Sequence, residues 1–205
     1  MTAHRFALLT GLYVAVVCSA QIGAQKIIEL PITGDAAPGG TYLIGVSLAL
    51  IEVAHHTAPS RREGWLHAQL MIAAGFVASA LLAGYIALVD ASPAAFPGQH
   101  FGELADTWRI VAASLAAFAV SETIDNMLGA SLRDRLHDAG RVAVTNAVSA
   151  PLDSVVFLAL AFGSLEFVEG QLQAKLAASF VLGIPLVLVA RRFLRRASGH
   201  MVPRT

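Results

Sequence analysis

The stretch Ala68-Gln-Leu-Met-Ile-Ala-Ala-Gly-Phe-Val-Ala-Ser-Ala-Leu-Leu-Ala-Gly-Tyr-Ile-Ala-Leu-Val89 carries no charged side chain from its first residue to its last. A helix needs about 20 mostly apolar residues to cross the hydrocarbon core of a bilayer. Apolar residues make up 56% of the chain and charged residues only 14%, which leaves too little polar surface for a water-soluble protein of this size. These observations predict an all-α integral membrane protein.

Further apolar segments lie on both sides of this stretch, and connections rich in proline and glycine separate them. Pro59 ends the segment before it, because proline cannot continue the hydrogen-bond ladder of a helix. We predict six transmembrane helices in a single transmembrane domain, residues 1–205. The predicted helices span about residues 6–25, 41–56, 65–89, 108–132, 142–165 and 172–193.

The positive charges are distributed unevenly about these six crossings. Of the fourteen Lys and Arg residues, most fall on one side: Arg5, Arg61, Arg62, Arg133, Arg135, Arg141, Arg191, Arg192, Arg195, Arg196 and Arg204. The opposite side holds Lys26, Arg109 and Lys175. Positive residues accumulate on the cytoplasmic side of a membrane protein. We therefore predict that both termini lie in the cytoplasm (N-in/C-in) and that the chain resides in the cytoplasmic membrane.

Composition also excludes several classes of function. The formal net charge is zero, so no basic field exists to attract a nucleic acid partner. Cys18 is the only cysteine, which excludes an internal disulfide and a thiolate metal cluster. No glycine-rich phosphate loop or nucleophile motif is recognisable, so we expect neither an enzyme nor a bound cofactor. The expected partners are a lipid bilayer and, if the chain assembles, a second copy of itself.

The fifth predicted helix carries a stripe of polar and aromatic side chains. Its members, spaced i, i+3, i+7 and i+11 on one helix face, are Asn146, Ser149, Asp153 and Phe157. A charged side chain at the centre of a transmembrane helix costs about 2.5–3.5 kcal/mol on insertion scales. Asp153 must therefore face a cavity, a partner or a substrate, or carry a proton. Pro151 frees a backbone carbonyl beside the stripe. A helix–helix contact through polar groups would explain Asn146 and Ser149 equally well.

The fourth predicted helix carries Glu122 and Asp125 on one face, at i and i+3. Two carboxylates this close rarely both ionise in a low dielectric, which would suit coupling of transport to protons. The alternative is that both lie near the cytoplasmic end and pair with Arg133 or Arg141.

Glu52, His55 and His56 gather at the end of the second predicted helix. Glu-x-x-His is a metal-ligand spacing on a helix, but the complete His-Glu-x-x-His pattern is absent. The favoured interpretation is a polar helix end or one wall of a substrate path. In the first helix, the small residues Ala20 and Ala24 predict close helix packing.

Longer segments of the chain resemble a known family of transporters. They are Arg109-Ile-Val-Ala-Ala-Ser-Leu-Ala-Ala-Phe-Ala-Val-Ser-Glu-Thr-Ile-Asp125, Leu132-Arg133, Asn146-Ala-Val-Ser149 and Asp153-Ser-Val-Val-Phe-Leu-Ala-Leu-Ala-Phe162, together with Ala24-Gln-Lys-Ile-Ile-Glu-Leu30 and a diverged segment at 51–62. The chain resembles the queuosine-precursor transporter family, also called the vitamin-uptake transporter family, over nearly its whole length.

The resemblance implies a six-helix secondary transporter that imports a 7-deazaguanine base. The positions that match the family are Asp125, Asn146, Ser149, Asp153, Ser154 and Phe157. The positions that depart from it are Glu52, which stands for an aspartate, His56, which stands for an acidic residue, and Glu122, which stands for a glutamine. These departures bear on which substrate is transported and on whether transport is coupled to an ion.

Such a base suits the predicted stripe. It presents a ring N–H and an exocyclic amine side by side, and a carboxylate can accept both in a bidentate arrangement. We expect Asp153 or Glu122 to bind that edge, Phe157 to stack on the ring, and Asn146 and Gln25 to orient it.

Three rival hypotheses remain at the level of sequence. The chain could be the substrate-binding subunit of a vitamin importer that uses a separate ATPase module, docked on Ala20 and Ala24. It could be a membrane metal-dependent enzyme that uses Glu52, His55 and His56. It could also be a helix-packing partner with no ligand, in which case Asp153 would tolerate an apolar replacement.

Overall fold

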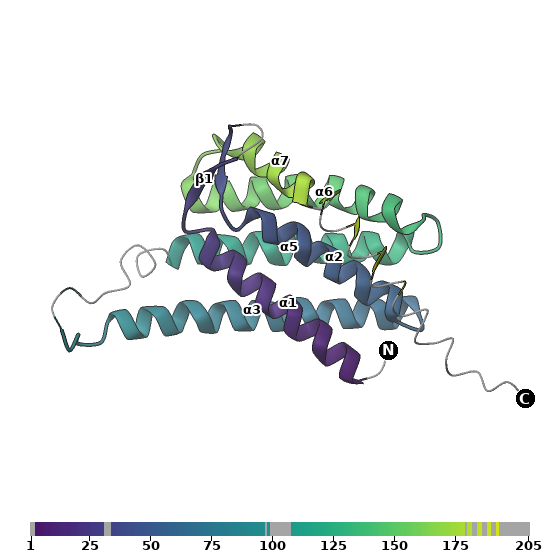
Figure 1. Ribbon diagram of the computed structural model, residues 1–205, viewed down its shortest axis with the longest axis horizontal. Coiled ribbons are helices and arrows are strands. Elements are labelled where there is room, and N and C mark those ends of the chain that lie inside the picture. Colours follow the sequence, from purple (N-terminus) through teal and green to yellow (C-terminus); the bar gives the residue numbers. More distant parts are fainter. Residues whose placement is uncertain are drawn as a thin grey trace, which may run out of the picture.

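The computed structural model describes residues 3–30, 34–96, 98 and 108–178, and only isolated positions after residue 178. Within these residues the chain forms an elongated bundle of helices (Figure 1). The helices are α1 (Ala3–Gly23), α2 (Thr41–Thr57), α3 (Arg61–Asp90), α5 (Trp108–Leu132), α6 (Asp138–Phe162) and α7 (Val168–Ala178). Helix α6 packs along α5, and α7 packs against α2 and α6.

The predicted helix boundaries agree with the structure most closely at α5, whose bounds are the same. Helix α3 begins four residues before the predicted start at residue 65 because Ser60 caps it, with its Oγ accepting a hydrogen bond from the Glu63 amide at 3.2 Å. Helix α6 ends at Phe162 and is followed by Gly163, which takes the left-handed conformation (φ 67°) that glycine adopts without strain. The predicted end of the sixth helix, near residue 193, lies outside the described residues.

The connection between α1 and α2, which the sequence shows only as a segment rich in proline and glycine, contains a short β-hairpin. Strands β1 (Ile27–Glu29) and β2 (Ala36–Pro38) pair antiparallel, with Ile28 opposite Ala37. The hairpin lies beside α7 at one end of the bundle (Figure 1). Pairing of the two strands provides hydrogen bonds for backbone N–H and C=O groups that lie outside the helices.

The hairpin leads into a close approach of two helices at Gly40. A Cβ built on Gly40 would overlap the backbone carbonyl oxygen of Ala20, and it would lie 3.0 Å from the amide nitrogen of Ala24. Ala20 and Ala24 are both buried. The predicted small-residue packing of α1 therefore occurs inside this protein, against the start of α2.

Replacing Gly40 by alanine is expected to destabilise the fold by about 1–3 kcal/mol, because backbone on both sides would have to move. Thermal unfolding of the purified variant in detergent measures this loss. Gly84→Ala is the matched control, since a Cβ at Gly84 meets nothing within 4 Å and alanine favours a helix. Equal midpoints for Gly40→Ala and wild type would contradict the packing described here.

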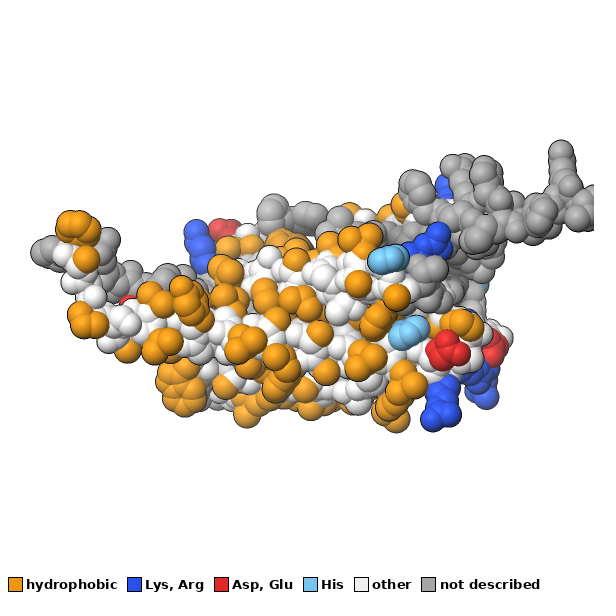
Figure 2. All heavy atoms as spheres, turned by 90° about the horizontal axis from the view of Figure 1, so that it is seen from below, with side chains coloured by type: hydrophobic (Ala, Val, Ile, Leu, Met, Phe, Trp, Pro, Cys, Tyr) orange, Lys and Arg blue, Asp and Glu red, His pale blue; other side chains and the backbone are white. Residues whose placement is uncertain are grey.

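The surface of the bundle is apolar where a soluble protein would be polar. Figure 2 shows hydrophobic side chains over the middle of one face, with Lys, Arg, Asp and Glu side chains near both ends of the bundle. Large exposed apolar side chains line α3: Leu66, Leu70, Val77, Leu81, Tyr85 and Leu88. In the described part, Ala3–Gly23, Arg61–Asp90 and Ala143–Phe162 are long and apolar enough to cross a membrane. The chain is an all-α integral membrane protein.

Polar contacts join the loops at the end of the bundle that holds Arg61 and Arg133. The Arg133 guanidinium donates to the Ala58 carbonyl at 2.8 Å, and Arg61 forms an exposed ion pair with Asp134. The loops before α3 and after α5 thus lie together, as alternate crossings require. Which side of the membrane they face stays a prediction.

Candidate functional site

Asp153 is buried in α6, with both carboxylate oxygens contacted by donors. The Ser121 hydroxyl of α5 donates to Oδ1 at 2.9 Å, and the Lys175 ammonium of α7 contacts Oδ2. Lys175 also lies 3.0 Å from the Ser154 hydroxyl. The side chain of Asp153 is 8% exposed and that of Lys175 is fully buried. The expectation that Asp153 faces a partner or a cavity agrees with this placement.

The structure places Lys175 elsewhere than the sequence predicted. It was counted as a charge on the outer side of the membrane, because it lies near the start of the sixth predicted helix. In the structure it lies inside the bundle, since α7 packs against α6 and turns this side chain toward Asp153. A buried charge is tolerated when an opposite charge meets it. The one signal in the sequence for this contact was a lysine within a predicted transmembrane helix, where a charged side chain needs a partner.

A cavity opens beside this ion pair, with about 360 Å³ of empty space when the open space at its mouth is included. Asp153 and Phe157 of α6 lie on its wall, as do Phe118 of α5, Thr41 of α2 and Gln171 of α7. The Thr41 hydroxyl and the Gln171 carbonyl oxygen are buried without a hydrogen-bond partner in the described part of the chain. A carboxylate, three further polar side chains with Ser114 included, and two aromatic rings thus face one space.

The wall of the cavity combines hydrogen-bond acceptors with aromatic rings. Each carboxylate oxygen has two lone pairs, so Ser121 and Lys175 leave one free lone pair on each oxygen of Asp153. An aromatic wall favours a planar ring. Thr41 and Gln171 were not predicted as site residues, because each lies near the end of a helix where polar residues are common.

The residues of the predicted stripe on α6 lie partly on the wall of this cavity and partly in the contact between α5 and α6. Asp153 and Phe157 line the cavity, whereas Ser149 donates to the Asp125 carboxylate at 3.2 Å. Asn146 is 2% exposed, and both polar atoms of its amide lack a partner among the described residues. Asn146, Ser149 and Asp125 are not among the lining residues.

Glu122 is fully buried but also does not line the cavity. Its carboxyl group contacts two hydroxyl groups, those of Tyr13 on α1 and Ser47 on α2, each at 3.2 Å. The alternative pairing of Glu122 and Asp125 with Arg133 or Arg141 is not what the structure shows. Arg133 donates to the Ala58 carbonyl, and Arg141 pairs with Glu52.

Glu52 and Arg141 form a second buried ion pair, between α2 and α6. The Arg141 Nε lies 2.6 Å from the Glu52 carboxylate, and neither side chain is more than 1% exposed. The positive-inside count placed Arg141 in a loop, but it lies one turn inside α6. His55 is fully buried nearby, and a Cβ on Gly129 of α5 would contact both Glu52 and His55.

The metal-site hypothesis finds no support in this arrangement. In the part of the chain with described side chains, no three His, Cys, Asp or Glu residues are placed to hold a metal ion. Glu52 is engaged by Arg141 instead. The side chain of His56 lies outside the described residues.

A family model described as "Putative vitamin uptake transporter" matches residues 53–190. The chain belongs to this family. No curated protein and no solved structure matches the chain. The matched segment contains α3, α5, α6 and α7, and therefore both Asp153 and Lys175, whereas α1 and Thr41 precede it. Membership of the family places this protein in the class of vitamin uptake transporters.

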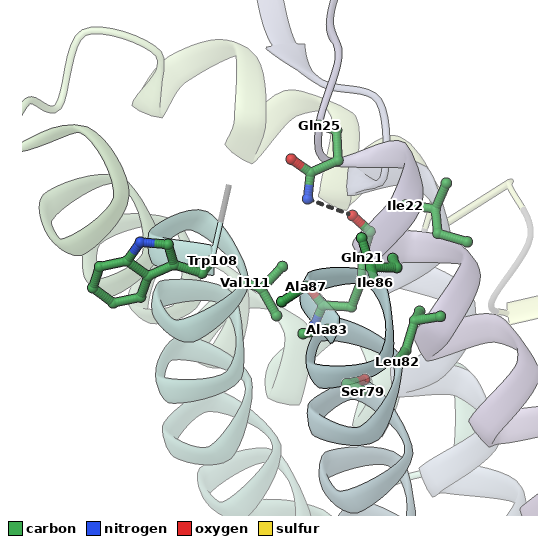
Figure 3. Close-up of a pocket in the computed structure, with 10 residues that line it drawn as sticks. All are labelled: Gln21, Ile22, Gln25, Ser79, Leu82, Ala83, Ile86, Ala87, Trp108 and Val111. Carbon is green, nitrogen blue, oxygen red and sulfur yellow. Dashed lines mark hydrogen bonds between the residues drawn. The ribbon is translucent and has the colours of Figure 1, made fainter. Parts of the chain in front are cut away.

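In this transporter Gln25 does not lie beside Asp153. It lines a second pocket between α1, α3 and α5, together with Gln21, Ser79 and Trp108 (Figure 3). The Gln25 amide donates to the Gln21 carbonyl at 3.4 Å. Ala20 and Ala24 line the cavity of Asp153, so the two pockets lie on different faces of α1. The expectation that Gln25 orients a base held by Asp153 disagrees with this geometry.

The docking surface suggested for a separate ATPase module is also not available on the outside of the transporter. Ala20 and Ala24 are buried against Gly40 and the cavity. The structure thus offers no surface for that alternative at the position where it was expected.

Proposed function

We propose that this transporter imports a queuosine precursor, a 7-deazaguanine-type base, or a similar planar, vitamin-like nitrogenous molecule. The observation that carries the proposal is the placement of one buried carboxylate, Asp153, and one aromatic ring, Phe157, on the wall of the same cavity. Uptake takes place across the cytoplasmic membrane through six helices with both termini in the cytoplasm, as the charge pattern predicts.

The proposed binding mode uses the lone pairs of Asp153 that remain free. The ring N–H and the exocyclic amine of the base donate to the two carboxylate oxygens, while Ser121 and Lys175 hold the carboxylate in place. The ammonium of Lys175 compensates the negative charge of Asp153, which would be costly in the membrane interior without a partner. Thr41 and Gln171 supply further hydrogen bonds at the rim.

The function is tested by complementation in a bacterial host that can neither make nor import deazaguanine precursors. The host receives this chain and a low concentration of precursor, and queuosine in its tRNA is measured. Restored tRNA modification is the expected result. Absence of modification, with the protein detected in the membrane, would exclude this substrate class. Where modification is restored, competition by other planar bases defines the range of substrates.

Replacing Phe157 by alanine is expected to weaken base uptake roughly 5- to 150-fold, because stacking of a base on an aromatic ring contributes about 1–3 kcal/mol. Uptake of labelled base at several concentrations measures this effect as a rise in KM. Phe157→Leu keeps most of the volume and is expected to lose uptake in the same direction.

Phe76→Ala is the matched control for this experiment. Phe76 lies on the exposed face of α3, away from the cavity lining, so its removal should leave KM unchanged. A Phe157→Ala protein that takes up base with wild-type KM would rule out stacking on this ring.

A further inference from the structure

Glu122 is a buried acid whose surroundings contain hydroxyl groups rather than cations. It is fully buried on α5, as are Tyr13 on α1 and Ser47 on α2. Tyr13 Oη lies 3.2 Å from Oε2, and Ser47 Oγ lies 3.2 Å from Oε1. In the part of the chain that the structure describes, no Lys or Arg lies within ion-pair distance of Glu122. Of the other buried acidic side chains, Glu52 and Asp153 each contact a cation, whereas Asp125 accepts a hydrogen bond from Ser149.

The hydrogen bonds around Glu122 fit a neutral carboxylic acid. Ser47 has one hydroxyl proton, and its oxygen lies closer to the Ile44 carbonyl, at 2.9 Å, than to Glu122. When Ser47 donates to Ile44, it can only accept from Glu122, which requires a proton on Oε1. Tyr13 then donates to Oε2. Every polar atom in this group has a partner in the protonated form.

The balance of charge near the cavity leads to the same conclusion. The charged and titratable groups around Glu122 are Tyr13 on α1, Asp125 on its own helix, Asp153 on α6 and Lys175 on α7. Lys175 neutralises Asp153. An ionised Glu122 would add a second negative charge for the same ammonium group. Such a charge is costly in the membrane interior.

We propose that Glu122 is a proton-binding site that couples proton movement to the Asp153 site. With Glu122 protonated, the ammonium of Lys175 interacts with Asp153 alone. The carboxylate of Asp153 then keeps the orientation that binds a base. When Glu122 releases its proton, it competes for Lys175, which lies within its electrostatic reach. The base-binding geometry is then lost, so the proton and the base bind cooperatively and cross together.

Ser121 adds a second link between the two sites. It precedes Glu122 on α5 and donates to Asp153 at 2.9 Å. Because Ser121 and Glu122 are adjacent in sequence, any movement of this turn of α5 would change the hydrogen bond to Asp153. No bond of the base is made or broken, and the proton that enters on Glu122 leaves from Glu122 on the other side.

The first test needs no substrate. The infrared spectrum of the purified transporter is expected to contain a carbonyl band from a protonated carboxylic acid. This band should disappear in Glu122→Gln, whose amide can accept from Tyr13 and donate to Ser47 in the same geometry. It should remain in Glu169→Gln, which removes an exposed carboxyl group on α7. Persistence of the whole band in Glu122→Gln would overturn the proposal.

The second test rests on the proposed function and uses the deazaguanine base in proteoliposomes. Wild-type protein should accumulate base when the outside is acidic and should also exchange labelled for unlabelled base without a gradient. Glu122→Gln should keep the exchange and lose at least ten-fold of the accumulation, whereas Glu169→Gln should behave as wild type.

The two proposals fail in different ways. No exchange by the wild-type protein would exclude the proposed substrate, and the infrared band would still test Glu122. Exchange with undiminished pH-driven accumulation in Glu122→Gln, or accumulation driven by sodium in place of protons, would overturn the role of Glu122 alone.

Discussion

Asp153→Asn is expected to reduce base uptake roughly 100-fold or more. The asparagine has the same shape, but it presents an amide N–H₂ where the base needs a second acceptor, and the remaining hydrogen bond is no longer charge-assisted. Loss of two charge-assisted hydrogen bonds corresponds to about 3 kcal/mol or more, which is a factor of about 100 or more in affinity. The restored queuosine content of tRNA, measured over a range of precursor concentrations, reports this loss.

A second effect of the same substitution has to be separated from the first. Asp153→Asn leaves the fully buried ammonium of Lys175 without the carboxylate that it contacts, and a buried charge without its partner destabilises a protein strongly. The double variant Asp153→Asn with Lys175→Met removes both charges and keeps a side chain of similar length. It is expected to regain wild-type abundance in the membrane and to stay inactive. Uptake by the double variant near the wild-type level would exclude Asp153 from the binding site.

Glu52→Gln is expected to lower the free energy of unfolding by about 3–5 kcal/mol, because the buried Arg141 guanidinium loses the carboxylate at 2.6 Å. Denaturation of the purified protein in mixed detergent micelles measures the loss. The double variant Glu52→Leu with Arg141→Met should recover most of the stability, since apolar side chains of similar volume can replace a buried ion pair.

An exposed ion pair of the same chemistry provides the control for Glu52. Arg61 and Asp134 are 52% and 61% exposed, and exposed pairs contribute about 0–1 kcal/mol. Asp134→Asn should therefore change stability by no more than this amount. If Glu52→Gln were as mild as Asp134→Asn, the buried pair would not hold α2 and α6 together as described.

The fold class could be predicted from the sequence because hydrophobicity is a local property of the chain. The uncharged stretch from Ala68 to Val89 forms the greater part of α3, and the predicted helix at 108–132 has the bounds of α5. The helical period also placed Asp153 and Phe157 on one face of α6, and both line the same cavity. These inferences depend only on neighbours within a few turns.

Other expectations could not succeed on such grounds. The strands β1 and β2 are short and contain Pro38, which gave no signal of pairing. Gln25 lies four residues after Gln21 and one after Ala24, yet the rotation of α1 directs it into a different pocket from that of Asp153. The direction in which a helix face points depends on its neighbours, and the period alone does not reveal it.

The sequence by itself determined that this chain enters a membrane, where its helices lie, and which carboxylates the bilayer would make costly. Only the tertiary structure decided which group meets each carboxylate. Lys175 reaches Asp153 from another helix, Arg141 reaches Glu52, and Tyr13 reaches Glu122 across 109 residues of sequence. The energetic cost of a buried charge follows from the residue and its depth, whereas its partner follows from how the helices rotate and pack against one another.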